Sequence, residues 1–128
     1  MANILFVDDD LDIAEAFSDL LRSEGHEVRT ASTGEEGLQL LRAEPLPSTV
    51  VLDVDMPILG GPGMAHQMLL HDAGEERIPI LLMSGRIDLP QVAARMGTPY
   101  FLRKPANIHA FLDLLDRALR ERVAPSHA

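Results

Sequence analysis

Short apolar runs alternate along the chain with longer segments whose apolar residues recur at helical spacing. Runs of about five residues, rich in Ile, Val and Leu, are typical of buried strands. We expect strands at 3–7, 27–31, 49–52, 80–83 and 100–103. The run at 27–31 is more polar than the others, and we therefore place it at an edge of the sheet.

The longer segments between these runs predict helices. Asp10 is the expected N-cap of the first helix, and Gly25 is the residue expected to stop it. Ser32 or Thr33 should cap a second helix, which Pro45 ends. Further helices are expected at 64–70, 91–96 and 108–119. This alternation predicts βαβ units, and therefore an α/β fold in which helices cover both faces of a parallel sheet.

The size and composition of the chain fit one folded domain. It has 128 residues, of which 46% are hydrophobic and 24% are charged, as is ordinary for a globular protein. The net charge of −9 would repel the phosphate backbone of a nucleic acid. We therefore expect no direct nucleic-acid partner.

The sequence also bears on the cellular compartment. It contains no cysteine, which excludes a disulfide framework and a thiolate metal site. The first residues lack the basic and long apolar regions of a secretory signal. The longest apolar runs reach about five residues, against the roughly 20 that a membrane-spanning helix needs. We expect a cytoplasmic protein without membrane insertion.

Polar side chains follow four of the five predicted strands. Asp8 and Asp9 come after the first strand, Asp53 after the third, Ser84 after the fourth and Lys104 after the fifth. The carboxyl ends of parallel strands open onto one edge of the sheet, where ligands bind in α/β folds. Because all these residues share that edge, we expect them to meet in one crevice.

The three carboxylates of this crevice would repel one another. Such repulsion raises the pKa of at least one carboxyl group unless a cation offsets the charge. Mg²⁺ prefers oxygen ligands and commonly bridges carboxylates to a phosphate, whereas a site without His or Cys disfavours zinc. The sequence therefore predicts Mg²⁺ as the cofactor of a phosphate-handling site.

Four motifs at the strand ends resemble those of a known family. They are VDDD at 7–10, LDVDMP at 52–57, MSG at 83–85 and FLRKP at 101–105, and together they resemble the receiver domain of response regulators over essentially the whole chain. The resemblance implies a doubly wound (βα)5, flavodoxin-like fold with strand order 2-1-3-4-5. It also implies a single-domain protein, similar to chemotaxis receivers, with the receiver at 1–123, a flexible tail at 124–128 and no output domain.

The same resemblance implies a role for each acidic residue. Asp53 is the expected phosphoacceptor. Asp9 is the expected direct Mg²⁺ ligand, with Asp8 beside it, and Asp53 and the backbone carbonyl of Asp55 complete the metal site.

Three further residues receive roles from the resemblance. Ser84 and Lys104 should each hold a phosphoryl oxygen, and Lys104 should also neutralise charge. Phe101 takes the position of the aromatic residue that changes rotamer on activation, although a strand residue beside Tyr100 is equally well read as a core side chain. Ser84 and Phe101 together would form the switch.

The implied partner is a protein that carries phosphohistidine, either a sensor histidine kinase or a histidine phosphotransfer protein. The phosphoryl group would pass from that histidine to Asp53 and later be lost by hydrolysis. Phosphorylation would alter the face formed by the fourth helix, the fifth strand and the fifth helix, where a downstream protein would bind.

Two alternatives compete with a phosphorylated receiver. Asp53-Val54-Asp55 is similar to the DxD motif of haloacid-dehalogenase-like phosphatases, but that motif normally follows the first strand of a longer chain. The second alternative is a pseudo-receiver that binds partners without phosphorylation, which is disfavoured because every acceptor, metal and Lys position is filled. We expect a signalling protein that assists its own phosphorylation and dephosphorylation, and not a conventional enzyme.

The chain departs from the family pattern around the expected site. The loop at 60–63 holds three glycines, and Gly85 stands where alanine is common, which could ease access of a phosphodonor. Arg86 and Asp55 lie two residues beyond Ser84 and Asp53. We hypothesise that Arg86 and Asp55 pair across the mouth of the site and slow the approach of water.

Overall fold

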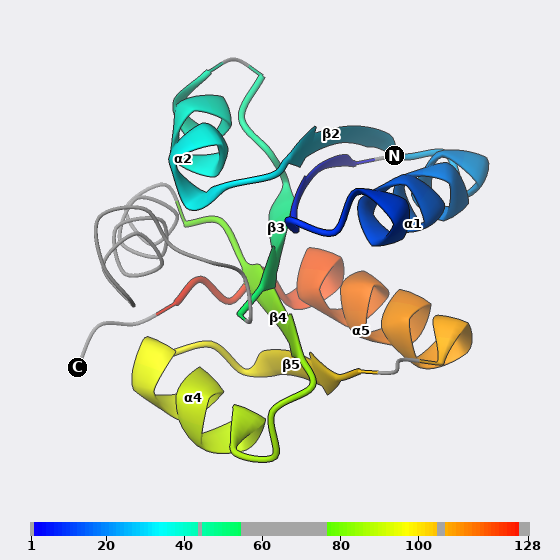
Figure 1. The fold of residues 1–128 in the computed structure, drawn as a ribbon. Coiled ribbons are helices and arrows are strands. Elements are labelled where there is room, and N and C mark those ends of the chain that lie inside the picture. Colours follow the sequence, from blue (N-terminus) through cyan, green and yellow to red (C-terminus); the bar gives the residue numbers. More distant parts are fainter. Residues whose placement is uncertain (1, 44, 55–76, 105–106, 126–128) are drawn as a thin grey trace.

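A parallel sheet forms the centre of the molecule. The computed structural model describes residues 2–43, 45–54, 77–104 and 107–125 (Figure 1). The sheet has five strands in the order β2-β1-β3-β4-β5, and all neighbouring strands are parallel. The strands are β1 (Asn3–Val7), β2 (Glu27–Ala31), β3 (Thr49–Asp53), β4 (Ile80–Ser84) and β5 (Tyr100–Arg103). The expected strands, their order and the edge position of β2 are confirmed.

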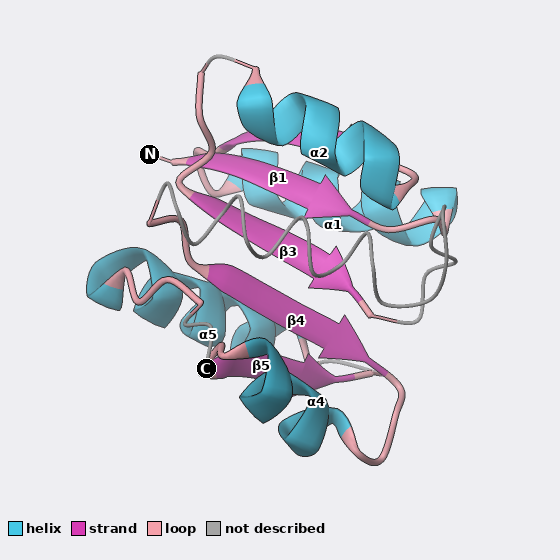
Figure 2. Ribbon diagram, turned by 90° about the vertical axis from the view of Figure 1, so that its left-hand side faces the viewer, coloured by secondary structure: helices cyan, strands magenta, loops and turns pink. Residues whose placement is uncertain are grey.

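Helices cover both faces of this sheet. They are α1 (Leu11–Ser23), α2 (Gly34–Arg42), α4 (Leu89–Met96) and α5 (Ile108–Glu121). Figure 1 shows α1 and α5 on one face and α2 and α4 on the other, and Figure 2 views the sheet from the α2 and α4 side. The doubly wound α/β fold is therefore confirmed. The helix expected at 64–70 and the glycine-rich loop at 60–63 lie outside the described residues.

Each face of the sheet has its own hydrophobic core. Under α1 and α5, the core includes Ile4, Phe6, Leu21, Val51, Leu81, Phe111 and Leu115. Under α2 and α4, it includes Leu5, Val7, Leu41, Leu52, Leu82, Leu89 and Ala93. All five residues of β3 and of β4 are buried, as expected of central strands covered on both sides. Burial of the strands fixes the positions of the residues at their carboxyl ends.

Local signals at the helix ends match those expected from the sequence. The side chain of Asp10 caps α1 by accepting hydrogen bonds from the backbone N–H groups of Asp12 and Ile13. Gly25 follows the end of α1 with a φ of 92°, a conformation that favours glycine. Thr33 caps α2 by accepting from the N–H of Glu36. These signals confirm both expected ends of α1 and the expected start of α2.

Helix α4 begins at Leu89, two residues before the start expected at 91. The helix therefore includes Pro90 in its first turn. Proline is tolerated in the first turn because the N–H that it lacks would have no partner within the helix there. In the described ranges, no helix combines the length and the apolar character needed to cross a membrane.

His26 links the start of β2 to the amino terminus of β1, and we expect this link to weaken at acidic pH. The backbone N–H of Ala2 donates to Nδ1 of His26 at 3.2 Å, so the bond requires an unprotonated nitrogen. Burial lowers the pKa of His26 below its ordinary value of 6.5. The unfolded chain therefore binds the proton more readily, and this contribution to stability is present above pH 6.5 and lost as the pH falls below it.

The effect can be measured by urea unfolding of the wild type and of His26→Gln at pH 7.5 and pH 5.5. We expect the stability difference between the two proteins to shrink by about 1 kcal/mol at the lower pH, the size of one hydrogen bond. His109→Gln is the matched control, because His109 is an exposed residue of α5. A wild-type advantage that stays constant with pH would contradict the prediction.

Candidate functional site

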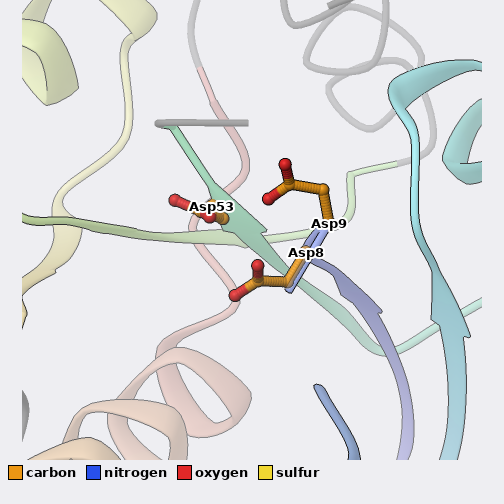
Figure 3. A group of neighbouring side chains, drawn as sticks. All are labelled: Asp8, Asp9 and Asp53. Atoms are coloured by element: carbon orange, nitrogen blue, oxygen red, sulfur yellow. The ribbon is translucent and has the colours of Figure 1, made fainter. Parts of the chain in front are cut away.

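Three aspartates meet at the carboxyl ends of two adjacent strands. Asp8 and Asp9 follow β1, and Asp53 is the last residue of β3. One carboxylate oxygen from each of the three lies within 4.8 Å of the others. Figure 3 shows the three side chains at the ends of their strands. Asp8 and Asp53 are buried, whereas Asp9 is exposed. The three aspartates that were expected to meet at this edge of the sheet therefore lie together.

Two hydrogen bonds fix the position of Asp8 at the end of the first strand. Its N–H donates to the carbonyl oxygen of Ala31 at 3.0 Å, which extends the pairing of β1 with β2 by one residue. Its Oδ1 accepts a hydrogen bond of 2.9 Å from the N–H of Asp10. The apolar residues of β1 are buried, and Asp8 continues that buried strand into the site.

Lys104 joins the aspartates from the far end of the chain. Its Nζ lies 3.2 Å from Oδ2 of Asp53 and 3.5 Å from Oδ2 of Asp8. Its backbone N–H donates to the carbonyl oxygen of Ser84 at 2.8 Å, which fixes the end of β5 against β4. One ammonium group thus contacts two buried carboxylates, and Ser84, also buried, lies at the adjacent strand end.

The charges of the site shift two pKa values. Burial raises the pKa of Asp8 from 3.8 to about 6, and the neighbouring Asp53 carboxylate adds to the rise, against the hydrogen bond from Asp10 and the charge of Lys104. Burial acts to lower the pKa of Lys104, but attraction to Asp53 and Asp8 outweighs it, so that pKa is raised. Lys104 therefore stays charged. Its single positive charge is smaller than the combined negative charge of the three ionised carboxylates.

The donor set of this site suits a hard cation. All three candidate ligand atoms are carboxylate oxygens, and the geometry of the three aspartates could hold a metal ion. Oxygen donors of this kind are the ligands that Mg²⁺ and Ca²⁺ accept, whereas zinc favours nitrogen and sulfur. The fourth expected ligand, the carbonyl of Asp55, lies outside the described residues.

Arg86 makes two contacts that the sequence did not predict, one with Ser84 and one with Asp88. The N–H of Arg86 donates to Oγ of Ser84 at 3.0 Å. The guanidinium of Arg86 forms a bidentate ion pair with Asp88, at 2.8 Å and 3.0 Å. Arg86 was expected to pair with Asp55, whose position is not described. Arg86 and Asp88 have opposite charges and lie two residues apart in the loop before α4. This spacing is the sequence signal that could have identified the observed pair.

Phe101 lies on β5, three residues before Lys104. It is partly buried and packs against the core beneath α2 and α4. Its neighbour Tyr100 points to the opposite face, where it is fully buried and its hydroxyl donates to Glu121 at 3.0 Å. Phe101 is thus a partly exposed aromatic residue on the α4 side of the sheet, while Tyr100 is part of the core.

Comparison with known proteins identifies the family. The pattern of the response regulator receiver domain matches residues 4–116. The chain belongs to the response regulator receiver family. A receiver domain is a signalling module of two-component systems and not a conventional enzyme, which leaves the phosphatase alternative without support. Its acidic metal-binding group and Lys104 are consistent with a phosphoacceptor switch.

Curated relatives and solved structures resemble this receiver along most of its length. Response regulator protein FleR of Pseudomonas aeruginosa is 38% identical over 119 residues, which are 91% of this chain and 24% of that protein. The transcriptional regulatory protein CpxR homolog of Haemophilus influenzae is 33% identical over 99% of this chain and 54% of its own length. A response regulator receiver domain protein from Clostridium thermocellum has a TM-score of 0.80 at 26% identity, with 95% and 97% of the two chains covered. The receiver spans about a quarter to a half of the length of the two curated relatives.

We expect Mg²⁺ to stabilise this receiver more at pH 7.5 than at pH 5. Because the pKa of Asp8 is about 6 in the folded chain and 3.8 in the reference state, the folded chain binds more protons between these values. The stability of the metal-free protein should therefore fall as the pH rises through this window. Mg²⁺ needs the ionised carboxylate, so protons compete with it below about pH 6. Thermal unfolding with and without Mg²⁺ at the two pH values measures the difference, and an equal shift in Tm at both would contradict it.

Proposed function

We propose that this receiver accepts a phosphoryl group on Asp53 from a phosphohistidine, with Mg²⁺ as cofactor. The observation that carries the proposal is the position of the Asp53 carboxylate. It is buried, lies 3.2 Å from the Nζ of Lys104, and lies beside two further carboxylates. A carboxylate beside a fixed ammonium group and a potential cation site is suited to phosphoryl transfer, which depends on position and charge compensation.

In the proposed transfer, a carboxylate oxygen of Asp53 attacks the phosphorus atom in line with the leaving imidazole. The new bond joins that oxygen to phosphorus, the bond between nitrogen and phosphorus breaks, and its electron pair stays on the imidazole nitrogen. Lys104 compensates charge on one phosphoryl oxygen, and the hydroxyl of Ser84 donates to another. Asp8, Asp9, Asp53 and the Asp55 carbonyl would hold Mg²⁺, which when bound supplies positive charge to the phosphoryl oxygens. Water later attacks the phosphorus, the bond between phosphorus and the Asp53 oxygen breaks, and inorganic phosphate leaves, which restores the carboxylate. We propose that the same charged groups of the receiver assist both steps.

The consequence of phosphorylation is a change of binding surface. The hydroxyl of Ser84 would move toward the phosphoryl group, and Phe101 would turn inward behind it. Phe101 is partly buried against the α4 side of the core, so a change in its rotamer would alter the face formed by α4, β5 and α5. We propose that a downstream protein binds this face and that a sensor histidine kinase or a histidine phosphotransfer protein supplies the phosphoryl group in the cytoplasm.

The proposal is tested by the intact mass of the protein after incubation with acetyl phosphate, with and without Mg²⁺. The expected result is a gain of one phosphoryl group that requires Mg²⁺. Beryllofluoride, which mimics an aspartyl phosphate, should also bind in the presence of Mg²⁺ if the phosphorylated form hydrolyses too fast to accumulate. A folded protein that neither gains mass nor binds beryllofluoride would favour the pseudo-receiver alternative instead.

A further inference from the structure

The charges of the chain are unevenly distributed, and α4 and β5 lie in its least acidic part. The whole sequence has 20 acidic and 11 basic residues, with a net charge of −9. The stretch at 89–112 contains no Asp or Glu, although it includes Arg95, Arg103 and Lys104. An even distribution of the acidic residues would place about four in a stretch of this length. The region of α4, β5 and the start of α5 is therefore locally basic in an acidic protein.

Two of these three positive charges lie at the surface. Lys104 is half-buried and is used within the site, where it contacts Asp53 and Asp8. Arg95 lies in the last turn of α4 and Arg103 is the last residue of β5, and both are exposed. Within the described ranges, neither of these arginines takes part in an ion pair. Two positive charges without a close acidic partner therefore remain at this surface.

Among the described residues that border this region, most acidic side chains are already paired with other arginines. Three such ion pairs, with distances of 2.8, 2.9 and 3.3 Å, are Arg86–Asp88, Arg120–Asp116 and Arg117–Glu121. Asp113 is the acidic residue of α5 outside these pairs, so α5 adds one negative charge against the two positive charges of α4 and β5. The combined surface of α4, β5 and α5 thus keeps an excess of positive charge.

Helix α4 lies beside β5 at one end of the sheet (Figure 1). Strand β5 is hydrogen-bonded to β4 alone, so its outer side is an edge of the sheet. Side chains alternate along a strand, and Phe101 and Arg103, two residues apart, therefore point to the same side of β5. Phe101 packs against the core beneath α2 and α4, which places both side chains on the α4 side. A partly exposed aromatic ring thus lies beside an exposed arginine on this surface.

We propose that the surface formed by α4 and β5 binds an acidic segment of the downstream protein, with Arg95 and Arg103 as its charged contacts and Phe101 as its apolar contact. Complementary charge selects the partner and speeds its association. Arginine and aromatic side chains are enriched in protein interfaces, whereas Asp and Glu are depleted, as they are in this stretch. A change in the rotamer of Phe101 would alter the apolar contact while the arginines stay in place. This inference rests on the proposed function, because phosphorylation is what turns Phe101.

Two other occupants of this surface are disfavoured by charge. A second copy of the chain, related by twofold symmetry, would bring two copies of the same positive surface together. A nucleic acid would meet the positive surface, but the net charge of −9 repels its phosphate backbone. A short acidic segment carries far less charge than a nucleic acid, and salt screens its repulsion by the rest of the molecule beyond about 8 Å. The acidic segment is therefore the occupant that this charge distribution favours.

The probe is an amphipathic helical peptide of about 15 residues whose polar side chains are Glu, and the reference peptide has Lys in place of Glu. In an NMR titration with Mg²⁺ and beryllofluoride, the Glu peptide should shift the amide signals of α4 and β5, and the Lys peptide should leave them unchanged. The affinity should fall about fivefold in Arg95→Ala and in Arg103→Ala, and roughly twentyfold in the double variant. Arg120→Ala is the matched control, because it removes an exposed arginine that is already paired with Asp116, and it should bind like the wild type. Equal affinity of the double variant and the wild type, or shifts on another surface, would overturn the inference.

Further measurements separate this inference from the proposed function. Arg95→Ala and Arg103→Ala should gain a phosphoryl group from acetyl phosphate at the wild-type rate, because the contacts within the site are made by Lys104 and the aspartates. If the wild type is phosphorylated but does not bind the Glu peptide, the acidic partner is wrong while phosphorylation of Asp53 stands. If the wild type takes up neither phosphoryl nor beryllofluoride, the proposed function fails. The titration without beryllofluoride, in which the arginines alone should give weaker binding at the same surface, then still decides whether this surface binds acidic segments. A dimer in sedimentation velocity with beryllofluoride, formed through α4 and β5, would assign the surface to a second copy and overturn the inference.

Discussion

Asp53→Asn should abolish the Mg²⁺-dependent gain of a phosphoryl group from acetyl phosphate. The amide is nearly the same size as the carboxylate, so the fold should persist, but it lacks the nucleophilic oxygen that attacks phosphorus. The substitution also removes the ion pair of 3.2 Å with Lys104. Intact-protein mass should show one added phosphoryl group for the wild type and none for the variant.

A control for this result is Asp113→Asn, which changes an exposed carboxylate on α5. This protein should gain a phosphoryl group at the same rate as the wild type. Circular dichroism of Asp53→Asn should match that of the wild type, which would exclude unfolding as the reason for the loss. A persistent mass gain in Asp53→Asn would mean that another side chain is the acceptor.

Asp8→Asn should stabilise the metal-free protein and at the same time weaken Mg²⁺ binding. The pKa of Asp8 is raised from 3.8 to about 6, so at pH 7.5 folding carries the cost of ionising a buried carboxylate. A neutral amide removes this cost and the repulsion from Asp53, for a gain of about 2 kcal/mol in the free energy of unfolding. The oxygen of Asn can still accept the hydrogen bond from Asp10. Loss of one charged ligand should lower the Mg²⁺ affinity by roughly tenfold or more.

Urea unfolding without Mg²⁺ and calorimetric titration with Mg²⁺ measure the two effects. Asp12→Asn is a suitable control, since Asp12 is an exposed residue in the first turn of α1 and should change neither quantity strongly. The extra stability of Asp8→Asn should also diminish below pH 6, where Asp8 of the wild type is protonated. A variant that is less stable than the wild type at pH 7.5 would show that the contact with Lys104 outweighs the cost of burial.

Much of the fold could be predicted because the sequence carries strong local signals. The apolar runs of β3 and β4 are buried on both faces, and such runs stand out from their polar flanks. The N-caps at Asp10 and Thr33 and the glycine after α1 marked helix ends to within a residue. The order of the strands came instead from the resemblance to receivers, since contacts between strands distant in sequence leave no local mark.

The site could be predicted as a set of residues but not in its internal arrangement. Strand ends converge by topology, which is why Asp8, Asp9, Asp53 and Lys104 were identified together. Which of two adjacent aspartates is buried depends on how the chain leaves β1, and no pattern in the sequence distinguishes them. The structure buries Asp8 and exposes Asp9. The contact of Lys104 with both Asp8 and Asp53 likewise depends on the positions of the side chains in the folded protein.

The loop before α4 is a second region whose structure could not be predicted from the sequence. Proline is both a helix breaker and a favoured first-turn residue, so Pro90 did not decide where α4 begins. Arg86 was expected to pair with Asp55, which lies outside the described residues, and the pair that the structure shows is with Asp88. That pair depends on loop geometry, which the sequence did not reveal.

Strand β2 has a consequence for the behaviour of the protein at high concentration. It lies at the edge of the sheet, where backbone groups on its outer side could pair with a strand of another molecule. Its outward residues include Glu27, Arg29 and Thr30, while Val28 and Ala31 are buried. Two neighbouring molecules that joined at this edge would have to bring the charged side chains of Glu27 and Arg29 close to those of the other molecule and remove water from them. The polar character that made β2 the weakest of the strands to recognise thus protects the folded protein against aggregation through its sheet.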